Sequence, residues 1–534
     1  MKIIVTTKQG LPYAAIVLVY ALGADLDIME VDAAQYASIS LEMLKSGNFL
    51  EVFDRHEPYL DKPPLLFWLS ALSMKLLGVG SWQYRFPSIL FSLLGILSTY
   101  QLGKLLYSEA VGRHASVILG ASVAMVMINN DVKTDTILVS SIVFAIWMMV
   151  AYLQKKRLGY LIGAALGISA AMLTKGPIGL MMPVLAIGGH LLFKREWRHL
   201  FDPKWLLMLL MVAMLLTPMC LGLYRQFGAE GLKFFFWIQS FGRITGESSW
   251  QNDTSPLFFT HVFLWSFLPW SFLAIAALFN ELRDIRRSLS DSSTELFLIS
   301  GTILVSVALS LSRFKLPHYI FVVYPLIAIL TAKYLHQLKR SILWSWFQLI
   351  LGSLVCLLLA VLLPYCFPGG GYWVSVVLIL SVIGAGIYFF NSYRSDQLVV
   401  PSFMLSIAIG IALNAHFYPQ LLPYQSNAFV GKWVVKNNID EDSFVGFATG
   451  GRALDFYAER VIPWMPDAES TIAAIKPGMV VYVNEERYAD LIKFKAFPKR
   501  EFVILNYPVQ RLSVRFLDPR TRPKVVEVNR LLFY

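Results

Sequence analysis

Carboxylates and single basic residues recur where apolar segments end, and together they could handle an anionic leaving group. Asp25, Asp27, Glu30 and Asp32 crowd the end of the first apolar run, although acidic residues are scarce in this chain. Carboxylates at a membrane boundary are costly without partners, so Asp25 and Asp27 are interpreted as markers of the interface. Asp32 begins an amphipathic stretch, where its carboxylate suits both a helix N-cap and a general base.

The segment PYLDKPPLLFW sets two adjacent opposite charges ahead of two prolines. Because proline restricts the backbone of the residue before it, Asp61 and Lys62 are expected in an extended turn at the start of an apolar helix. One interpretation is an interfacial ion pair. The other is that Lys62 faces a lipid-linked phosphate, for which a lysine is a suitable point charge.

Further single charges occur near the ends of other apolar segments. They are Arg85, Asp135, Lys175, Arg243 and Lys315. Each alone is most simply a helix-end residue that extends to water. Together they supply the carboxylates and cations that stabilise charge on a departing phosphate. No G-x-x-x-x-G-K-S/T, H-E-x-x-H or G-x-S-x-G element lies in a supporting context, which disfavours nucleotide hydrolysis and metalloprotease chemistry.

Composition identifies lipid as the main solvent of this chain. Its 534 residues are 56% hydrophobic and 15% charged, with a mean hydropathy of +0.58, which excludes an ordinary water-soluble protein. The net charge of +11 comes from short basic clusters between apolar runs, so it indicates topology and not nucleic-acid binding. Cys220, Cys356 and Cys366 lack metal-ligand spacing and predict neither a disulfide framework nor a thiolate metal site.

Thirteen apolar windows are long enough to cross a bilayer, at roughly 17 to 25 residues each. They lie near 11–29, 84–106, 111–128, 135–153, 158–174, 177–193, 204–224, 257–280, 295–312, 317–335, 342–365, 371–391 and 400–417. Alternate loops carry basic clusters, which predicts that these loops and the N-terminus are cytoplasmic. We therefore expect a multi-pass α-helical protein of the bacterial inner membrane with its C-terminal segment outside.

Two hydrophilic parts are expected outside a transmembrane module of residues 1–417. The outer loop 30–83 begins with VDAAQYASISLEMLKSG, whose apolar residues share one face and predict an amphipathic helix that could lie on the membrane surface. The tail 418–534 contains strand-like runs at 444–448 and 479–483 after a helical pattern. It predicts a small α/β extracytoplasmic domain in which nothing looks catalytic.

The order of these elements resembles the GT-C glycosyltransferases, in particular the branch with the bacterial 4-amino-4-deoxy-L-arabinose lipid A transferase and the protein O-mannosyltransferases. The matching elements are VDAAQYASISLEM, LDKPPLLFW, RFPS at 85–88, Asp135, LTKG at 173–176, Arg243 and KLPHY at 315–319. The resemblance implies the GT-C fold and a sugar donor linked to a polyprenyl phosphate such as undecaprenyl phosphate. The implied acceptor is lipid A, another glycolipid or glycan, or a protein on the periplasmic side.

By the same resemblance, Asp32 is the principal catalytic carboxylate and Asp135 is a second acidic residue of the site. The implied ligands of the carrier phosphate or its sugar are Tyr59, Lys62, Arg85, Lys175, Arg243, Lys315 and Tyr319. The chain departs from the family pattern, in which the outer helix usually has Asp-Glu-x-Arg-Tyr, because it has Ala33 and Gln35 at the second and fourth positions. It also has Ser240 for a histidine and Asp61 for a glutamate, and these losses argue against a divalent metal at Asp61.

Two other functions use the same kind of residues. A flippase or transporter of lipid-linked sugars needs phosphate-facing cations, but it would place them near the middle of the membrane, among broken helices. An O-antigen-type ligase also takes a polyprenyl-linked donor, but its site is expected in one long late loop. The predicted reaction is an inverting displacement, in which the acceptor oxygen attacks the anomeric carbon as polyprenyl phosphate departs.

Overall fold

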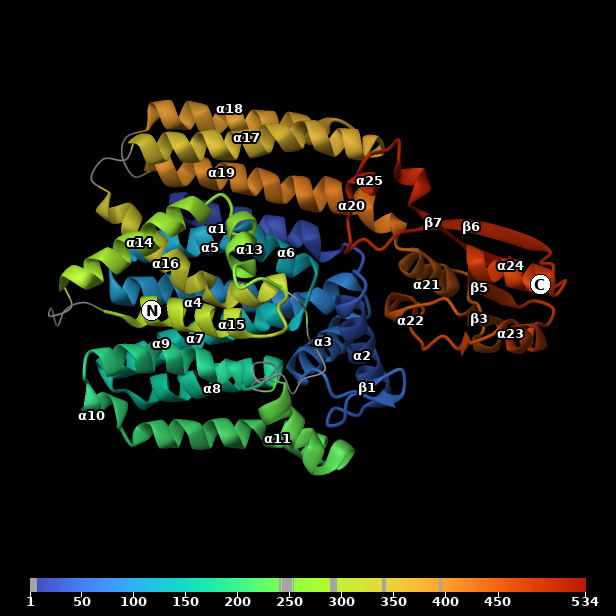
Figure 1. Ribbon diagram of the computed structural model, residues 1–534, viewed down its shortest axis with the longest axis horizontal. Coiled ribbons are helices and arrows are strands. Elements are labelled where there is room, and N and C mark those ends of the chain that lie inside the picture. The colour runs from blue at the N-terminus through green and yellow to red at the C-terminus, as the bar shows by residue number, and fades with distance from the viewer. Residues whose placement is uncertain are drawn as a thin grey trace.

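The computed structural model describes residues 7–239, 242, 252, 254–288, 295–338, 342–392 and 396–534, and the structural statements below concern these residues. A body of long helices is followed by a smaller domain that contains a sheet (Figure 1). Helix α1 (Thr7–Ala24) begins at the end of the body that lies far from this domain. Its other end leads into the outer loop, which lies between the body and the C-terminal domain (Figure 1).

The helical body confirms the multi-pass architecture but not the count of thirteen spans. Its remaining helices are α4 (Ser81–Leu106), α5 (Glu109–Gly120), α6 (Val123–Asn130), α7 (Thr134–Lys155), α8 (Leu158–Lys175), α9 (Ile178–Phe193), α10 (Trp197–Leu200), α11 (Lys204–Lys233), α13 (Phe258–Ser266), α14 (Ser271–Ser288), α15 (Phe297–Leu311), α16 (Tyr324–Gln337), α17 (Ile342–Cys366), α18 (Trp373–Asn391) and α19 (Asp396–Ala412). In the described part of the chain, eight helical segments are long and apolar enough to cross a membrane, or nine if the bent α5–α6 pair is one span.

The difference in count comes from helix length. Every predicted window falls on helix, but some of these helices are short: α9 has 16 residues and α15 has 15. At about 1.5 Å per residue these lengths fall below the roughly 30 Å of a hydrocarbon core. The predicted windows 177–193 and 295–312 are at most three residues longer than these helices, so both segments lie at the lower limit of a membrane span.

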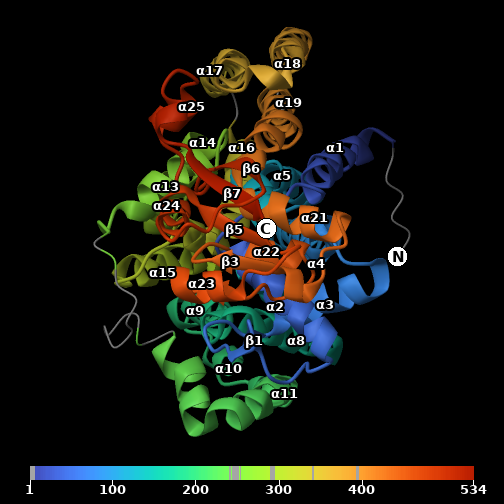
Figure 2. The same ribbon diagram turned by 90° about the vertical axis from the view of Figure 1, so that its right-hand side faces the viewer.

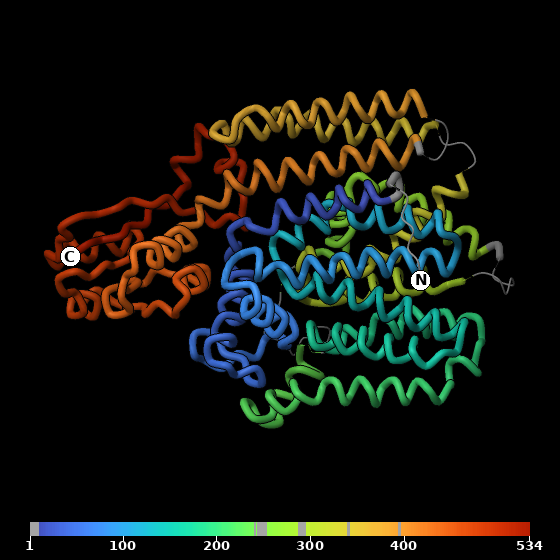
Figure 3. Tube along the Cα trace, turned by 180° about the vertical axis from the view of Figure 1, so that it is seen from behind, coloured from blue at the N-terminus to red at the C-terminus, as the bar shows by residue number. Residues whose placement is uncertain are grey.

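The helices form three layers (Figure 1). One outer layer consists of α17, α18 and α19, which have an apolar core of their own. The other outer layer consists of α8, α9 and α11, and the central layer includes α4, α5, α7, α15 and α16. The view from behind shows the same separation (Figure 3). One large apolar cluster joins α1 and α4 through α9 to α15 and α16, so the central layer is the core of the membrane body.

The C-terminal domain is the small α/β domain that the sequence predicts. Its five-stranded sheet has the order β4-β3-β5-β7-β6, with strands β3 (Phe444–Phe447), β4 (Trp464–Met465), β5 (Val480–Asn484), β6 (Arg500–Asn506) and β7 (Glu527–Phe533). Strand β3 is parallel to both of its neighbours, whereas β7 is antiparallel to β5 and β6. Helices α21 (Ser426–Lys436), α22 (Arg452–Tyr457), α23 (Ala468–Ala474) and α24 (Glu485–Lys493) accompany it (Figure 2).

The outer loop forms helix α2 (Asp32–Ser46), the hairpin strands β1 (Phe53–Asp54) and β2 (Glu57–Pro58), and helix α3 (Leu65–Leu77). The predicted amphipathic helix is therefore present, and its apolar face packs against α3 and α22 inside the protein. The expected N-cap role of Asp32 is wrong. Asp32 is the first residue of α2, and the cap position is Val31, which makes no side-chain hydrogen bond. A carboxylate in the first turn still interacts favourably with the helix dipole.

Candidate functional site

Two cavities meet beneath the outer loop. The first, of about 90 Å³, has an apolar lining that includes Leu138, Ile178, Met181, Ala308, Leu309 and Val322, and we call it the apolar cavity. The second, of about 390 Å³, is lined by polar groups that include Asp32, Gln35, Tyr59, Asp61, Lys133 and His318, and we call it the polar cavity. The wall that they share consists of Lys62, Asp135, Lys175 and Tyr319.

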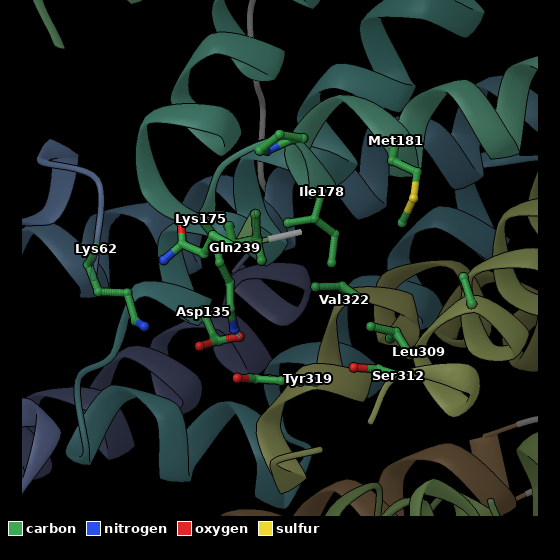
Figure 4. Close-up of a pocket in the computed structure, with 13 residues that line it drawn as sticks. Lys62, Asp135, Lys175, Ile178, Met181, Gln239, Leu309, Ser312, Tyr319 and Val322 are labelled. Carbon is green, nitrogen blue, oxygen red and sulfur yellow. Dashed lines mark hydrogen bonds and ion pairs between the residues drawn. The ribbon is translucent and has the colours of Figure 1, made fainter. Parts of the chain in front are cut away.

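The shared wall is organised by an ion pair between two helix ends. Asp135 lies in the first turn of α7 and Lys175 is the last residue of α8. Because the helices are antiparallel neighbours, these ends meet, and Lys175 Nζ lies 2.6 Å from Asp135 Oδ1. Lys175 Nζ also lies 4.0 Å from the centre of the Tyr319 ring, which is a cation–π contact. Figure 4 shows these side chains and Lys62 converging at one point.

His318 faces the other oxygen of the same carboxylate, at 3.4 Å from Nε2 to Asp135 Oδ2. Asp135 is therefore held between two basic side chains, and its own side chain is only 1% exposed. The sequence reasoning missed His318, although it lies in the KLPHY segment beside Tyr319. Its position in that motif was the signal available.

The adjacent charges of the outer loop do form an ion pair, with Lys62 Nζ 2.6 Å from Asp61 Oδ2. Lys62 also lines both cavities. The ion pair is therefore confirmed, and the contact of Lys62 with a phosphate stays a prediction. The side-chain amide of Gln239 donates a hydrogen bond to the Asp61 carbonyl. This contact ties the segment after α11 to the outer loop, and it was not visible in the sequence.

Asp32 and Tyr59 face the polar cavity from the outer loop. Asp32 keeps a side chain that is 40% exposed, and its Oδ2 lies 3.3 Å from Lys133 Nζ. Burial lowers the pKa of Lys133, but Asp131 and Asp32 outweigh that effect and raise the pKa above its ordinary value, so Lys133 stays charged. The Tyr59 hydroxyl is buried without a hydrogen-bond partner among the described residues, and burial raises its pKa. A neutral phenol beside a cavity is available to a ligand.

The structure does not bring every predicted residue to this wall. Arg85 is 1% exposed, and its guanidinium donates to the carbonyls of Asn130, Ala24, Leu26 and Asp27. It therefore fixes the end of α1. Lys315 Nζ donates to the Thr254 carbonyl at 3.3 Å and lines neither cavity. Arg243 and Ser240 lie outside the described residues.

The groups around Asp61 do not fit a divalent metal. Such a metal binds best where several oxygen or nitrogen ligands converge. The Asp61 carboxylate instead pairs with the Lys62 ammonium. Within the ranges that the structure describes, no three His, Cys, Asp or Glu side chains are grouped to hold a metal ion.

Comparison with known proteins agrees with the motifs. Residues 61–221 match the family described as dolichyl-phosphate-mannose-protein mannosyltransferase. An uncharacterised protein from Aquifex aeolicus is 28% identical over 80% of this chain and 82% of its own length. The undecaprenyl phosphate-alpha-4-amino-4-deoxy-L-arabinose arabinosyl transferase of Edwardsiella ictaluri is 26% identical over 58% of this chain, and that of Pseudomonas aeruginosa is 29% identical over 54%. The chain spans 56% and 52% of the length of these two transferases.

Solved structures show the same fold over nearly the whole chain. ArnT from Cupriavidus metallidurans bound to undecaprenyl phosphate superposes with a TM-score of 0.76 at 20% identity, over 97% of each chain. Its apo state gives a TM-score of 0.75 over 90% of this chain and 94% of that one. The chain therefore has the fold of the GT-C glycosyltransferases, and the resemblance to their arabinosyl transferases and protein mannosyltransferases that its motifs indicated is confirmed.

Proposed function

We propose that the protein is an integral membrane glycosyltransferase that moves a sugar from a polyprenyl phosphate carrier, such as undecaprenyl phosphate, to an acceptor outside the bacterial inner membrane. The observation that carries this proposal is the wall between the two cavities. An amphipathic donor needs an apolar space beside a polar one, with cations at the boundary for its phosphate. Lys62 and Lys175 lie at that boundary.

In this function the carrier phosphate binds at Lys62, Lys175 and the hydroxyl of Tyr59, and the first isoprenoid units enter the apolar cavity. The sugar then lies in the polar cavity. Asp135 orients Lys175, because both of its oxygens face basic groups and almost none of its surface is exposed. The cations stabilise the charge that develops on the phosphate as it leaves.

Asp32 is the carboxylate that meets the acceptor, because it is the more exposed of the two and opens into the polar cavity. A bond forms between the acceptor oxygen and the anomeric carbon while the bond from that carbon to the phosphate oxygen breaks. The electron pair leaves with the phosphate, and the acceptor proton passes to Asp32. General-base assistance of this kind is worth about 10² to 10⁴ in rate. If the acceptor is itself a phosphate, Asp32 orients it.

The site and the C-terminal domain belong on the periplasmic side, and the N-terminus on the cytoplasmic side. Basic residues gather at the opposite end of the body, in the α7–α8 connection at 155–157 and around α10 at 194–204. Cytoplasmic loops are the ones enriched in Lys and Arg. The resemblance to lipid A transferases makes lipid A the acceptor to test first, before other glycolipids and proteins.

The test is mass spectrometry of lipid A, carrier lipids and glycoproteins from cells with and without the gene. The deletion should remove one sugar from one acceptor, and wild-type protein should restore it. Asp32→Asn should not restore it, whereas Asp25→Asn should, because Asp25 is exposed and lines neither cavity. Identical products in all strains would reject the transferase. Failure of the sugar-loaded carrier to reach the outer leaflet would favour a flippase instead.

A further inference from the structure

The C-terminal domain holds the outer loop through partly buried polar contacts that begin just before α2. Glu30 Oε1 accepts hydrogen bonds from Asn427 Nδ2 at 3.0 Å and from the Ala453 backbone N–H at 3.3 Å. The Glu30 backbone N–H donates to Gln425 Oε1 at 2.9 Å. All three partners belong to the segment around α21 and α22. These hydrogen bonds therefore fix the backbone two residues before Asp32.

A second contact reaches α2 itself through Arg452, the first residue of α22. Its guanidinium binds the Asp54 carboxylate at two points, with Nη2 at 3.0 Å from Oδ2 and Nε at 3.3 Å from Oδ1. Gln35 Nε2 donates to the same Oδ2 at 2.7 Å. Arg452, Asp54 and Gln35 thus form one chain of polar contacts from the C-terminal domain to the helix that begins with Asp32. A planar guanidinium that binds at two points fixes direction as well as distance.

The apolar contacts lie in the same place. Ala33 and Ala37 of α2 are fully buried in one cluster with Ala453 and Phe456 of α22. Their small side chains let the two helices lie close together, and Figure 2 shows α2 and α22 next to each other. Helix α3 packs in the same cluster. The position of α2 is therefore set jointly by the membrane body and by the C-terminal domain.

Gln35 connects the contact between Arg452 and Asp54 to the candidate site, so this contact does more than attach the C-terminal domain to the outer loop. It lies one helical turn after Asp32 and lines the polar cavity with it. The ion pairs that remain inside the domain, such as Arg530 with Glu485, have no such link to the cavity. The Arg452 contact leads through Asp54 to Gln35, which lines the polar cavity.

We propose that Arg452 is a positioning residue of the transfer reaction, and that the C-terminal domain sets the direction of the Asp32 carboxylate through the Arg452–Asp54–Gln35 chain. This inference rests on the proposed function. Arg452 supplies the guanidinium of this chain from the C-terminal domain, and α2 supplies the neutral amide of Gln35. A displacement of about 1 Å at a reacting group costs about a hundredfold in rate. A residue that holds Asp32 in place can therefore affect the rate strongly without touching the substrate.

The test uses full-length protein and three variants: Arg452→Gln, Arg452→Gln with Gln35→Arg, and Arg530→Gln as the matched control in the same domain. Arg452→Gln should lower acceptor modification per folded protein by about ten- to a hundredfold. Its affinity for undecaprenyl phosphate should change less than about twofold, because Lys62 and Lys175 are untouched. Adding Gln35→Arg should restore most of the transfer, because the new guanidinium reaches Asp54 from within α2. Arg530→Gln should match the wild type.

Hydrogen exchange of the amides in 32–46 supplies a readout that does not depend on transfer. Arg452→Gln should speed exchange in α2, and the added Gln35→Arg should reverse that change. Wild-type transfer and exchange in Arg452→Gln would overturn the inference, and so would a loss of transfer that Gln35→Arg does not rescue. If the wild type itself transfers no sugar, the proposed function fails, and unchanged exchange in α2 would separately refute the role of Arg452 in ordering that helix.

Discussion

Lys175 Nζ lies 2.6 Å from Asp135 Oδ1 in the wall that separates the apolar cavity from the polar one. The pair joins the last residue of one helix to the first turn of the next, and both helices belong to the packed body. Because the partners come from rigid elements, the ammonium has a fixed direction toward the space where the two cavities meet.

Asp135→Asn should lower transfer by about a hundredfold, because Lys175 loses the charge that orients it toward the carrier phosphate. The amide keeps the size of the side chain and an acceptor oxygen for Lys175, so folded protein should still be recovered. Steady-state kinetics in proteoliposomes would measure the effect. Asp202→Asn is the control, because Asp202 accepts from Tyr152 Oη at 2.8 Å beside the other end of α7. Equal losses in both variants would contradict the assignment.

His318→Leu should cost about tenfold in turnover, less than Asp135→Asn, because its contact with Asp135 Oδ2 at 3.4 Å is longer than that of Lys175. Affinity for undecaprenyl phosphate should stay close to that of the wild type. Turnover and carrier binding are measured on the same preparation. An unchanged turnover would show that His318 does not support the carboxylate.

Ala308→Trp should weaken binding of undecaprenyl phosphate by about tenfold or more, because the indole fills the apolar cavity. Its neighbour Val307 is 51% exposed and lines neither cavity, so Val307→Trp should bind like the wild type. Quenching of intrinsic tryptophan fluorescence by the carrier can be compared for both. Full binding by Ala308→Trp would mean that the isoprenoid chain lies elsewhere.

Arg85→Gln should lower the melting temperature and the yield of folded protein, because several buried carbonyls lose the donor that they share. Each unsatisfied buried group costs about 1 to 3 kcal/mol. The protein that does fold should transfer sugar at close to the wild-type rate, since Arg85 lines neither cavity. A variant that folds well but transfers no sugar would instead indicate that Arg85 binds the donor, as the motif implies.

Asp455 makes the C-terminal domain sensitive to pH. Burial raises its pKa from 3.8 to about 6, even though Arg55 pairs with it and the Ile462 N–H donates to it. A carboxyl whose pKa is raised by folding contributes stability that is fully present below about pH 4 and is lost as the pH rises through about 6. The wild-type domain should therefore lose stability between these values, and Asp455→Asn should show a flatter profile in thermal unfolding. If the stability of both proteins depended on pH in the same way, Asp455 would not be the source of the pH sensitivity.

Hydropathy was sufficient for the helical body but not for its count of spans. All thirteen windows fall on helix, because an apolar run in lipid must satisfy its own backbone hydrogen bonds. Helices α9 and α15 are too short to count as independent spans, because charged residues follow or precede them closely: Lys194 follows α9, and Glu295 and Arg313 flank α15. The strand runs at 444–448 and 479–483 were found because short, continuous apolar runs are a local signal of a buried strand.

The sequence by itself pointed to Lys62, Asp135 and Lys175, but also to Arg85 and Lys315, which line neither cavity. A charged side chain in the middle of an apolar helix costs free energy in the membrane. Lys62, Asp135 and Lys175 are therefore expected near helix ends, and this is where their motifs lie. Tertiary structure alone decided which ends meet. Asp135 and Lys175 are 40 residues apart, and Asp54 and Arg452 are 398 apart. No periodicity specifies such contacts, because they follow from how whole helices and domains pack. For the same reason only the fold revealed His318, Lys133 and Arg452 beside the carboxylates that they hold.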